Sequence, residues 1–362
     1  MIKPLELMKP FLVVFSSIIV ICEKELSVLA EGQIERFFNI LNEVTEIVQK
    51  QKDQSYLDSL IEVLDTVQSG DVDALGLTSA DAKKVDHKYA EFKRDDYDAE
   101  TLRKSIQMAV LKATRVDKIQ ANYQITPDTI ADIIGYIISG IFSGQKQLSL
   151  LDPAMGTGNL LTAVYNQLDN NLHIKPAVSG IENDDAMFEL AASSFDIQHI
   201  HAELFHEDTI QNVLAPVVDV VISDLPIGYY PIDENTKGFR TRSSNGHSYV
   251  HHLLIEFAMD HVRNGGFGFF LVPSQLFKTN EAKQLLKWMQ GNVYLQGLLN
   301  LPSELFQNKA SQKAIMILQK SGGNAKQASP IMLGEFPSFK DRSAFQKFLT
   351  EIDDWQKKDL LQ

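Results

Sequence analysis

Two short segments in the middle of the chain combine residue types that could bind a nucleotide-like ligand. Residues 151–158 read Leu-Asp-Pro-Ala-Met-Gly-Thr-Gly and lie between an apolar run and a helical pattern. Glycines at such a turn let the backbone bend sharply and approach a ligand closely, because no side chain intervenes. The next apolar run ends at Gly180-Ile181-Glu182-Asn183, where the Glu182 carboxylate could accept hydrogen bonds from both hydroxyls of a ribose. A surface acid in a loop is the simpler interpretation of Glu182, but its position after a strand favours the binding role.

The elements around these segments predict an α/β domain. Apolar runs with the length of buried strands lie at Leu148–Leu151, Ala177–Ile181, Val217–Ile222, Gly268–Val272, Leu295–Asn300 and Ala314–Leu318, with a further strand around His199 and His201. Helical patterns lie between most of them, at Leu160–Leu168, Asp185–Phe195 and Tyr249–Val262. This alternation predicts a doubly wound, mostly parallel sheet with helices on both faces.

The segments that flank this region are predicted to be helical. Apolar residues such as Phe37, Leu41, Val44 and Val48 recur at three- and four-residue steps, as an amphipathic helix requires. Residues 69–80 are polar and predict a loop, and the charges between residues 83 and 100 indicate a solvated surface. We therefore expect a helical domain over residues 34–120, a catalytic domain over 121–325 and a C-terminal helical tail over 326–362.

Residues 1–33 form an N-terminal extension with an apolar run from Phe11 to Cys22. The run is too short to span a bilayer, which needs about 20 residues, although it has the shape of a signal-peptide core. Glu23, Lys24 and Glu25 follow it at once, with no small-residue cleavage site beside it. A packed segment or an upstream-extended start is therefore the favoured interpretation, and we expect a cytoplasmic protein with no membrane partner.

Composition limits the kinds of partner and cofactor. The net charge of -13 gives the chain no general attraction to nucleic acid, so contact with DNA would need a local basic patch. Lys237, Arg240 and Arg242 could meet phosphates, although a mobile solvated loop explains them equally well. The single cysteine excludes a cysteine-rich zinc site. The histidines, including His251 and His252, show no metal spacing and are interpreted as packed or solvated, so no metal is expected.

Asp-Pro-Ala-x-Gly-Thr-Gly is much narrower than a bare glycine pattern, and it resembles the cofactor loop of adenine-specific DNA methylases, including the modification subunits of type I restriction systems. The resemblance extends from about Asn122 to Lys320 and is strongest to the small YtxK-like class I methyltransferases. It implies a seven-stranded Rossmann-like methyltransferase sheet with a helical N-terminal domain, and S-adenosylmethionine as cofactor. The cofactor contacts that it implies are Asp152, Ala154, Gly156, Thr157, Gly158, Glu182 for the ribose, Asn183, and Asp208 for the adenine.

The segment from Tyr123 to Pro127 precedes the cofactor loop. Thr126 followed by Pro127 is a good helix start, with an N-cap hydroxyl and then proline at the first helical position. The segment also resembles the one that covers the methionine end of the cofactor in this family, which implies cofactor contacts from Tyr123 and Thr126. The order of the motifs is that of the gamma arrangement.

Residues 223–231 read Ser-Asp-Leu-Pro-Ile-Gly-Tyr-Tyr-Pro directly after an apolar strand, and resemble the family signature Asn/Asp/Ser-Pro-Pro-Tyr/Phe. The resemblance implies that Asp224 accepts a hydrogen of the exocyclic adenine amine, with a backbone carbonyl binding the other, so that the nitrogen lone pair aims at the methyl group. Asp224 is also expected to contact the cofactor, and Pro226 matches the second proline. Leu225 replaces the first proline, and Ile227 stands where an aromatic residue should stack on a base outside the helix. Tyr229 or Tyr230 could stack instead, if the turn at Gly228 redirects the chain.

These features predict transfer of a methyl group to the exocyclic amine of adenine in DNA, with DNA bound at moderate to low affinity. Methylation of RNA, a protein amide or a small molecule is the alternative within the same fold. A catalytically inactive, cofactor-binding regulator is a third interpretation, favoured by Leu225 and Ile227. A dehydrogenase would leave the Asp-Pro-Ala loop unexplained. The N-terminal helices could bind a second copy or another protein.

Overall fold

The computed structural model describes residues 18–118, 125–211, 213–306 and 311–361, with side chains described from residue 31 onward. The chain divides into two compact units, residues 1–118 and 119–362. Most of the apolar run from Phe11 to Cys22 and all of Tyr123 lie outside the described residues. Among the helices in the described ranges, none combines the length and the apolar character needed to cross a bilayer.

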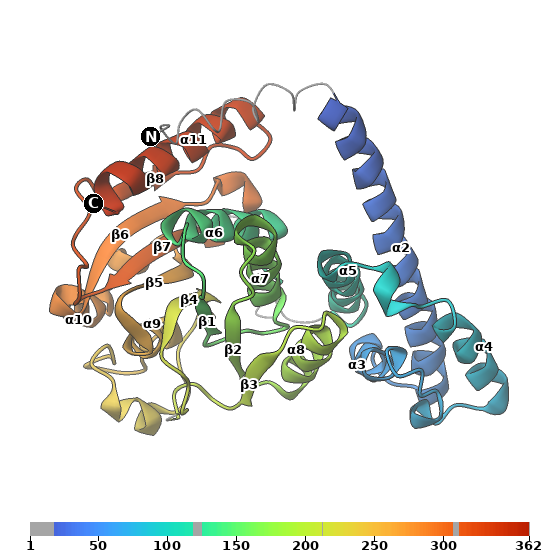
Figure 1. The fold of residues 1–362 in the computed structure, drawn as a ribbon. Helices are drawn as coiled ribbons and strands as arrows, with labels where there is room; N and C mark the ends of the chain where they lie inside the picture. The colour runs from blue at the N-terminus through green and yellow to red at the C-terminus, as the bar shows by residue number, and fades with distance from the viewer. Residues whose placement is uncertain (1–17, 119–124, 212, 307–310, 362) are drawn as a thin grey trace. The chain divides into compact units, whose positions relative to one another are not determined.

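The first unit is helical, which confirms the predicted helical N-terminal region (Figure 1). Its helices are α2 (Ile18–Lys52), α3 (Tyr56–Val67), α4 (Ser79–Tyr89) and α5 (Ala99–Val116), with single turns η2 (Asp73–Leu75) and η3 (Arg94–Asp96). The Asp117 carboxylate, just after α5, accepts hydrogen bonds from the backbone N–H groups of Tyr56 and Leu57 at 3.1 and 2.8 Å. This contact satisfies two of the unpaired donors at the start of α3.

Helix α4 lies where we expected a loop followed by a solvated, charged surface. Its Val85 and Tyr89 are buried, while the lysines and aspartates around them face solvent. Thr78 begins the helix, because its hydroxyl accepts a hydrogen bond from the Asp81 backbone N–H. Only two of the eleven residues of α4 are buried and apolar, so the sequence shows no apolar periodicity that would predict a helix.

The second unit contains one sheet with the strand order β3-β2-β1-β4-β5-β7-β6-β8. Every pairing is parallel except those of β7, which is antiparallel to both β5 and β6. The strands are β1 (Ser149–Asp152), β2 (Ala177–Glu182), β3 (Ala202–His206), β4 (Val218–Asp224), β5 (Val262–Pro273), β6 (Val293–Asn300), β7 (Lys313–Lys320) and β8 (Met332–Glu335). The predicted mostly parallel α/β sheet is thus confirmed.

The sheet has eight strands rather than the expected seven. The additional strand, β8, pairs in parallel with β6 and lies in the segment after residue 326 that we expected to be helical. Strand β8 has only four residues, and its Leu333 is mostly exposed. It therefore lacks the apolar run by which the other strands were predicted. The helical part of this segment begins at Arg342.

Helices cover both faces of the sheet (Figure 1). One face packs against α6 (Asp128–Ile141), α7 (Asn159–Leu172), α8 (Asp185–Ile197) and α11 (Arg342–Trp355), and the other against α9 (Val250–Asp260) and α10 (Ala282–Asn292). The remaining turns are η5 (Asp233–Gly238), η6 (Leu276–Lys278), η7 (Ser303–Leu305) and η9 (Gln356–Leu360). Successive strand residues alternate between the two cores, as Leu150 and Leu151 do, which explains the continuous apolar runs of the sequence.

The strand order reverses between β1 and β4, because β2 and β3 extend the sheet to one side and β5 to the other. Open α/β sheets bind ligands outside the carboxyl ends of their strands at such a switch point. The glycine loop after β1 and the Asp224 loop after β4 meet there.

Candidate active site

Backbone hydrogen bonds to β2 and within the loop hold the glycine loop after β1 in place. The Met155 N–H donates to the Ile181 carbonyl of β2 at 3.0 Å, and the Gly158 N–H donates to the Met155 carbonyl at 2.9 Å. Gly156 and Gly158 both adopt positive φ, at 54° and 73°. A Cβ on Gly158 would lie 2.8 Å from the Phe195 ring, whereas a Cβ on Gly156 would have no heavy atom within 4 Å. Packing therefore requires the glycine at 158, and Gly156 leaves space for a ligand.

Glu182, at the end of β2, is bound to the same loop. Its carboxylate accepts hydrogen bonds from the backbone N–H groups of Gly156, Asn183 and Asp184 at 2.8 to 2.9 Å. Burial raises the pKa of this carboxyl. Glu182 is thus half-buried and has three backbone donors, so the interpretation of Glu182 as a surface acid in a loop is wrong. Its two oxygens have four acceptor positions, which leaves capacity for a ligand hydroxyl.

Asp152, the last residue of β1, joins the two loops of the switch point. Its Oδ1 accepts hydrogen bonds from the Ser223 hydroxyl at 2.7 Å and from the Ala154 N–H at 3.0 Å. Burial, with a smaller contribution from the nearby Glu182 and Asp224 carboxylates, raises its pKa from 3.8 to about 7. Ser223 had no assigned role in the sequence, yet it connects β4 to the cofactor loop.

Both oxygens of the Asp224 carboxylate have partners. Oδ2 accepts a hydrogen bond from the Thr126 hydroxyl at 3.0 Å, and Oδ1 pairs with the ammonium of Lys313, the first residue of β7. The predicted N-cap role of Thr126 is wrong, because Pro127 occupies the position before α6 and the Thr126 side chain reaches Asp224 instead. Lys313 carried no signal in the sequence, since it belongs to no motif.

The replacement of a proline by Leu225 has a structural consequence. The Leu225 N–H donates to the Leu271 carbonyl of β5 at 3.3 Å, a hydrogen bond that proline cannot make. The β4–β5 ladder ends at the Asp224–Leu271 pair, which this hydrogen bond completes, and the Leu225 side chain is buried in the core. Ile227, at the position expected for the aromatic residue, is about half exposed.

The two candidate aromatic residues differ in their surroundings. Tyr230 is buried, and its hydroxyl donates to Asp208 Oδ2 at 2.6 Å, which links the Asp224 loop to the loop after β3. Tyr229 is 53% exposed, and its ring stacks on Tyr249 with centroids 4.5 Å apart and an angle of 9° between the rings. Of the two, Tyr229 is the one whose ring a base could reach.

The adjacent histidines of α9 support this aromatic pair. His251 lies 5.0 Å from the Tyr249 ring and hydrogen-bonds to the Pro226 carbonyl. Burial lowers the pKa of His251 to about 3 and that of His252 to about 4, so both rings are neutral at physiological pH. The interpretation of this pair as packed histidines is confirmed. Across the part of the chain that the structure describes, no three acidic, histidine or cysteine side chains form a group that could hold a metal ion.

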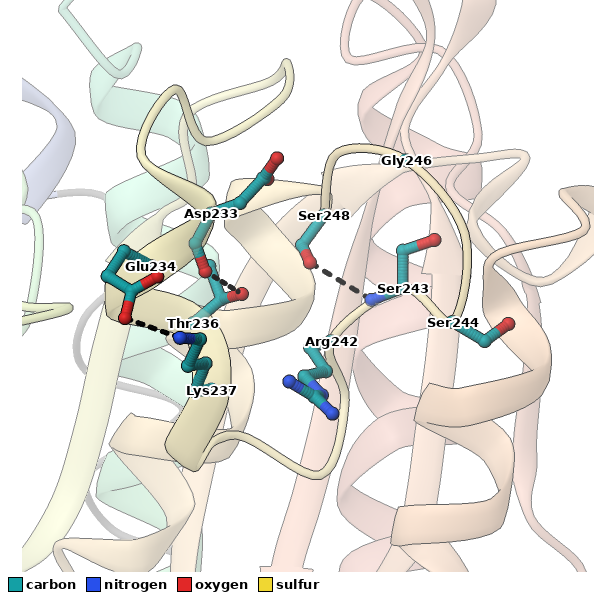
Figure 2. Close-up of a pocket in the computed structure, with 9 residues that line it drawn as sticks. All are labelled: Asp233, Glu234, Thr236, Lys237, Arg242, Ser243, Ser244, Gly246 and Ser248. Carbon is teal, nitrogen blue, oxygen red and sulfur yellow. Dashed lines mark hydrogen bonds and ion pairs between the residues drawn. The ribbon is translucent and has the colours of Figure 1, made fainter.

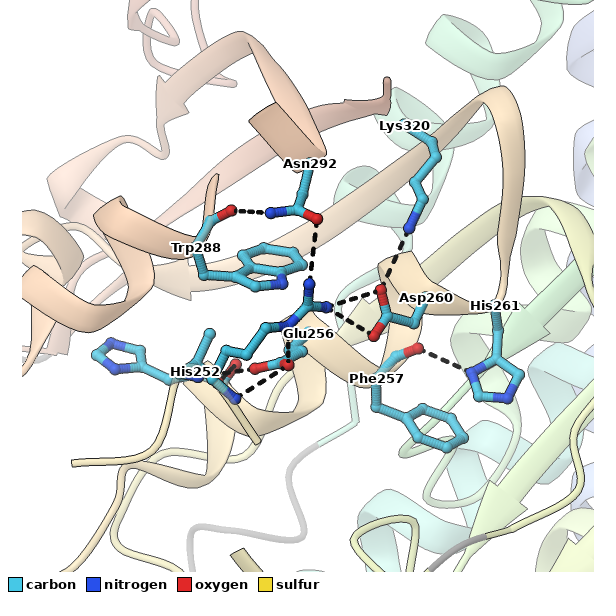
Figure 3. A network of polar contacts seen from close by, with 10 residues as sticks. His252, Glu256, Phe257, Asp260, His261, Trp288, Asn292 and Lys320 are labelled. Carbon is cyan, nitrogen blue, oxygen red and sulfur yellow. Dashed lines mark hydrogen bonds and ion pairs between the residues drawn. The ribbon is translucent and has the colours of Figure 1, made fainter. Parts of the chain in front are cut away.

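The three cations of the loop after Pro231 have different partners. The Arg240 guanidinium bonds Glu256 at 2.8 Å and Asp260 at 2.9 Å in the network of Figure 3, and lies over the Trp288 ring. Arg240 is therefore an anchor of the loop rather than a phosphate ligand. Lys237 pairs with Glu234, while Arg242 is exposed and lines a polar pocket with Ser243 and Ser248 (Figure 2).

Comparisons with known proteins identify the family of the chain. Residues 110–353 match the N-6 DNA methylase family, and residues 35–114 match the YtxK N-terminal helical domain. The chain is 36% identical to YtxK of Bacillus subtilis (strain 168) over 91% of its own length and all of that protein. It superposes with a TM-score of 0.83 on a structure from Listeria monocytogenes assigned to the class I S-adenosylmethionine-dependent methyltransferases, at 35% identity, covering 90% of this chain and 99% of that one.

A more distant structure shares the fold. The methyltransferase subunit of a type I restriction-modification system from Streptococcus thermophilus superposes with a TM-score of 0.60 at 16% identity, covering 87% of this chain and 74% of that subunit. The sheet and its strand-end loops thus define a Rossmann-like, S-adenosylmethionine-dependent methyltransferase. Within that class, the chain belongs to the N-6 DNA methylase family and carries the helical N-terminal domain of the YtxK type.

The environment of Asp152 predicts a pH-dependent stability. The unfolded chain ionises this carboxyl near pH 4, whereas the folded chain does so only near pH 7, so folding loses stability as pH rises between these values. We expect Asp152→Asn to unfold at a higher temperature than the wild type, with a difference that widens up to about pH 7 and then stays constant. The Asn oxygen can accept both existing hydrogen bonds.

Thermal unfolding followed by circular dichroism between pH 5.5 and 8.5 measures this difference. Asp184→Asn is the control, because asparagine replaces aspartate well at the start of a helix and Asp184 begins α8. A difference for Asp152→Asn that does not change with pH would contradict a raised pKa at this position.

Proposed function

We propose that this protein transfers a methyl group from S-adenosylmethionine to the exocyclic amine of adenine in DNA. The observation that carries the proposal is the joining of the cofactor loop and the Asp224 loop at one switch point through the Asp152–Ser223 hydrogen bond. Membership of the N-6 DNA methylase family supports the reaction type. Methyl transfer to RNA, a protein amide or a small molecule is the alternative. The labelling experiment distinguishes these substrates from DNA.

The residues around the switch point fit the proposed cofactor. Bound S-adenosylmethionine supplies a methyl group activated by a positively charged sulfur. Asp152, Glu182 and Asp224 form an acidic surrounding for such a cation. Space beside Gly156 admits the ligand, with Ala154, Thr157 and Gly158 in the same loop. Glu182 and Asn183 would hold the ribose, and Asp208 the adenine.

Thr126 and Asp224 would act at the reacting end of the substrate. The Thr126 hydroxyl orients the Asp224 carboxylate, which would accept one hydrogen of the target amine. A backbone carbonyl of the Asp224 loop would accept the other hydrogen, and the nitrogen lone pair would then face the methyl group. As the new nitrogen–carbon bond forms, the sulfur–methyl bond would break, S-adenosylhomocysteine would leave, and the nitrogen would lose one proton to solvent. The Pro226 carbonyl already hydrogen-bonds to His251, so its proposed role is to hold the loop against α9.

Tyr229 is the proposed stacking partner of the target base. Adenine must leave the double helix to reach an acceptor inside the protein, and an aromatic face compensates for its lost stacking. The Tyr229–Tyr249 pair offers such a face in the loop that follows Asp224 along the chain.

Transfer of labelled methyl groups to unmethylated DNA tests the proposed reaction. We expect label on adenine with the wild type, and a loss of at least about a hundredfold in Asp224→Ala, as when one preorganised hydrogen-bonding group is removed from an active site. Calorimetric titration with S-adenosylmethionine checks that the variant still binds cofactor. Asp354→Ala, at an exposed acid of α11, is the control. Label on RNA or protein alone would replace DNA as the substrate, and no transfer despite cofactor binding would favour the regulator.

Gly156→Val tests the assigned cofactor loop. A valine would project into the space beside the loop and would strain a backbone with φ of 54°, so we expect cofactor binding to be lost. Gly144→Val is the matched control, because Gly144 also has positive φ and open surroundings but lies in the turn after α6. Equal cofactor affinity in the two variants would remove the glycine loop from the proposed site.

Tyr229→Ala tests the stacking role. Base–aromatic stacking contributes about 1–3 kcal/mol per base, so we expect kcat/KM for DNA to fall about tenfold or more. Tyr229→Phe keeps the ring and should retain most of the activity. Steady-state kinetics with Ile227→Ala alongside compares the two positions. A larger loss in Ile227→Ala than in Tyr229→Ala would assign the base contact to residue 227.

A further inference from the structure

We propose that Lys313 competes with the substrate amine for the Asp224 carboxylate and thereby restrains the acceptor until a substrate is bound. This inference rests on the proposed function, because it concerns the amine that Asp224 would receive. It assigns a specificity-determining role to a residue outside every motif of the chain. Three features of the Lys313 side chain support this role, namely its position, its partners and its charge.

The sheet itself brings Lys313 to Asp224. Asp224 ends β4 opposite Leu271 of β5, and Lys313 begins β7 opposite Pro273, two residues further along β5. The ammonium pairs with Asp224 Oδ1 while Thr126 occupies Oδ2. The side chains of Lys313 and Asp224 are 23% and 19% exposed, so water weakens this ion pair less than one on the surface.

The Lys313 contact uses the same chemistry that the substrate would use. An ammonium donates N–H groups to the carboxylate as an exocyclic amine does, and its positive charge adds a Coulombic attraction that a neutral amine lacks. Methyl transfer also moves positive charge onto the substrate nitrogen. The carboxylate stabilises that charge, whereas a cation paired with the same carboxylate opposes it. Lys313 therefore weakens Asp224 as an acceptor, whether the amine displaces the ammonium or shares the oxygen with it.

The resting protein has a physical reason to keep this lysine. Asp224 lies near Asp152 and Glu182, and their mutual repulsion contributes to the raised pKa of Asp152. A partly buried carboxylate without a counter-ion in this cluster would be costly. Lys313 removes that cost in the absence of substrate. An amine that arrives with additional contacts, such as base stacking on Tyr229, can then outcompete the lysine, whereas a free nucleoside or a simple amine does so less well.

Lys313→Met tests the competition, because methionine keeps an unbranched apolar stem and removes the charge. Lys320→Met is the matched control: Lys320 ends the same strand, is 17% exposed and pairs with Asp260. We expect Lys313→Met to raise kcat/KM for methyl transfer to DNA by about fivefold or more, mainly through a lower KM, as the loss of a charge-assisted competitor predicts. Lys320→Met should stay within about twofold of the wild type, since its partner Asp260 is 44% exposed and belongs to none of the loops of the proposed site.

The outcomes separate this inference from the proposed function. A fall in kcat for Lys313→Met would make Lys313 a positioning residue of Asp224 and would overturn the competition, with DNA methylation intact. Transfer of label to DNA by Lys313→Met together with none by the wild type would support the competition and would contradict the proposed function of the unaltered protein. If neither protein labels DNA although both bind S-adenosylmethionine, the proposed function fails, and the competition fails with it.

Acetylation of the lysines, read by mass spectrometry, measures the displacement directly. With S-adenosylhomocysteine present, an adenine-containing oligonucleotide should increase the acetylation of Lys313 in the wild type relative to an oligonucleotide of thymidine alone. The acetylation of Lys320 should be the same with both. Equal acetylation of Lys313 with the two oligonucleotides, in a protein that methylates DNA, would overturn the competition alone.

Discussion

The hydrogen bond between the Ser223 hydroxyl and the Asp152 carboxylate is the contact on which the geometry of the candidate site depends. Asp152 ends β1 and Ser223 lies one residue before the end of β4, so the bond crosses the point where the strand order reverses. Both side chains are buried, and Asp152 Oδ1 also holds the Ala154 N–H at the start of the glycine loop. One buried carboxyl thus sets the distance between the loop proposed for the cofactor and the loop proposed for the substrate.

Charge is the second constraint on the site. Asp152, Glu182 and Asp224 lie close enough together for their repulsion to contribute to the raised pKa of Asp152, and burial adds the larger part. Backbone N–H groups stabilise Glu182, and Lys313 balances Asp224. The surplus of negative charge that remains suits a cationic cofactor.

Residues at strand ends were predictable from the sequence, because a turn motif and the apolar run before it are local features. The positions of the glycine loop, Glu182 and Asp224 follow from that rule. Contacts made across the sheet were not predictable. Lys313 meets Asp224 because β7 runs antiparallel beside β5, and Thr126 meets it because α6 begins next to β4. No local sequence pattern indicates that Lys313 or Thr126 contacts Asp224. The helix-capping rule for Thr-Pro predicted that the Thr126 hydroxyl would bind a backbone N–H of the helix, whereas it binds Asp224.

The departure at Leu225 shows how one backbone donor changes the meaning of a motif. A proline after Asp224 has no N–H and could not make the hydrogen bond that completes the last pair of the β4–β5 ladder, Asp224 with Leu271. Leu225 makes that bond, and the next aromatic residues along the chain are Tyr229 and Tyr230. Tyr230 is engaged with Asp208, while Tyr229 stacks on Tyr249 at the surface. Within the proposed function, we therefore interpret the altered signature as an aromatic face moved from residue 227 to Tyr229.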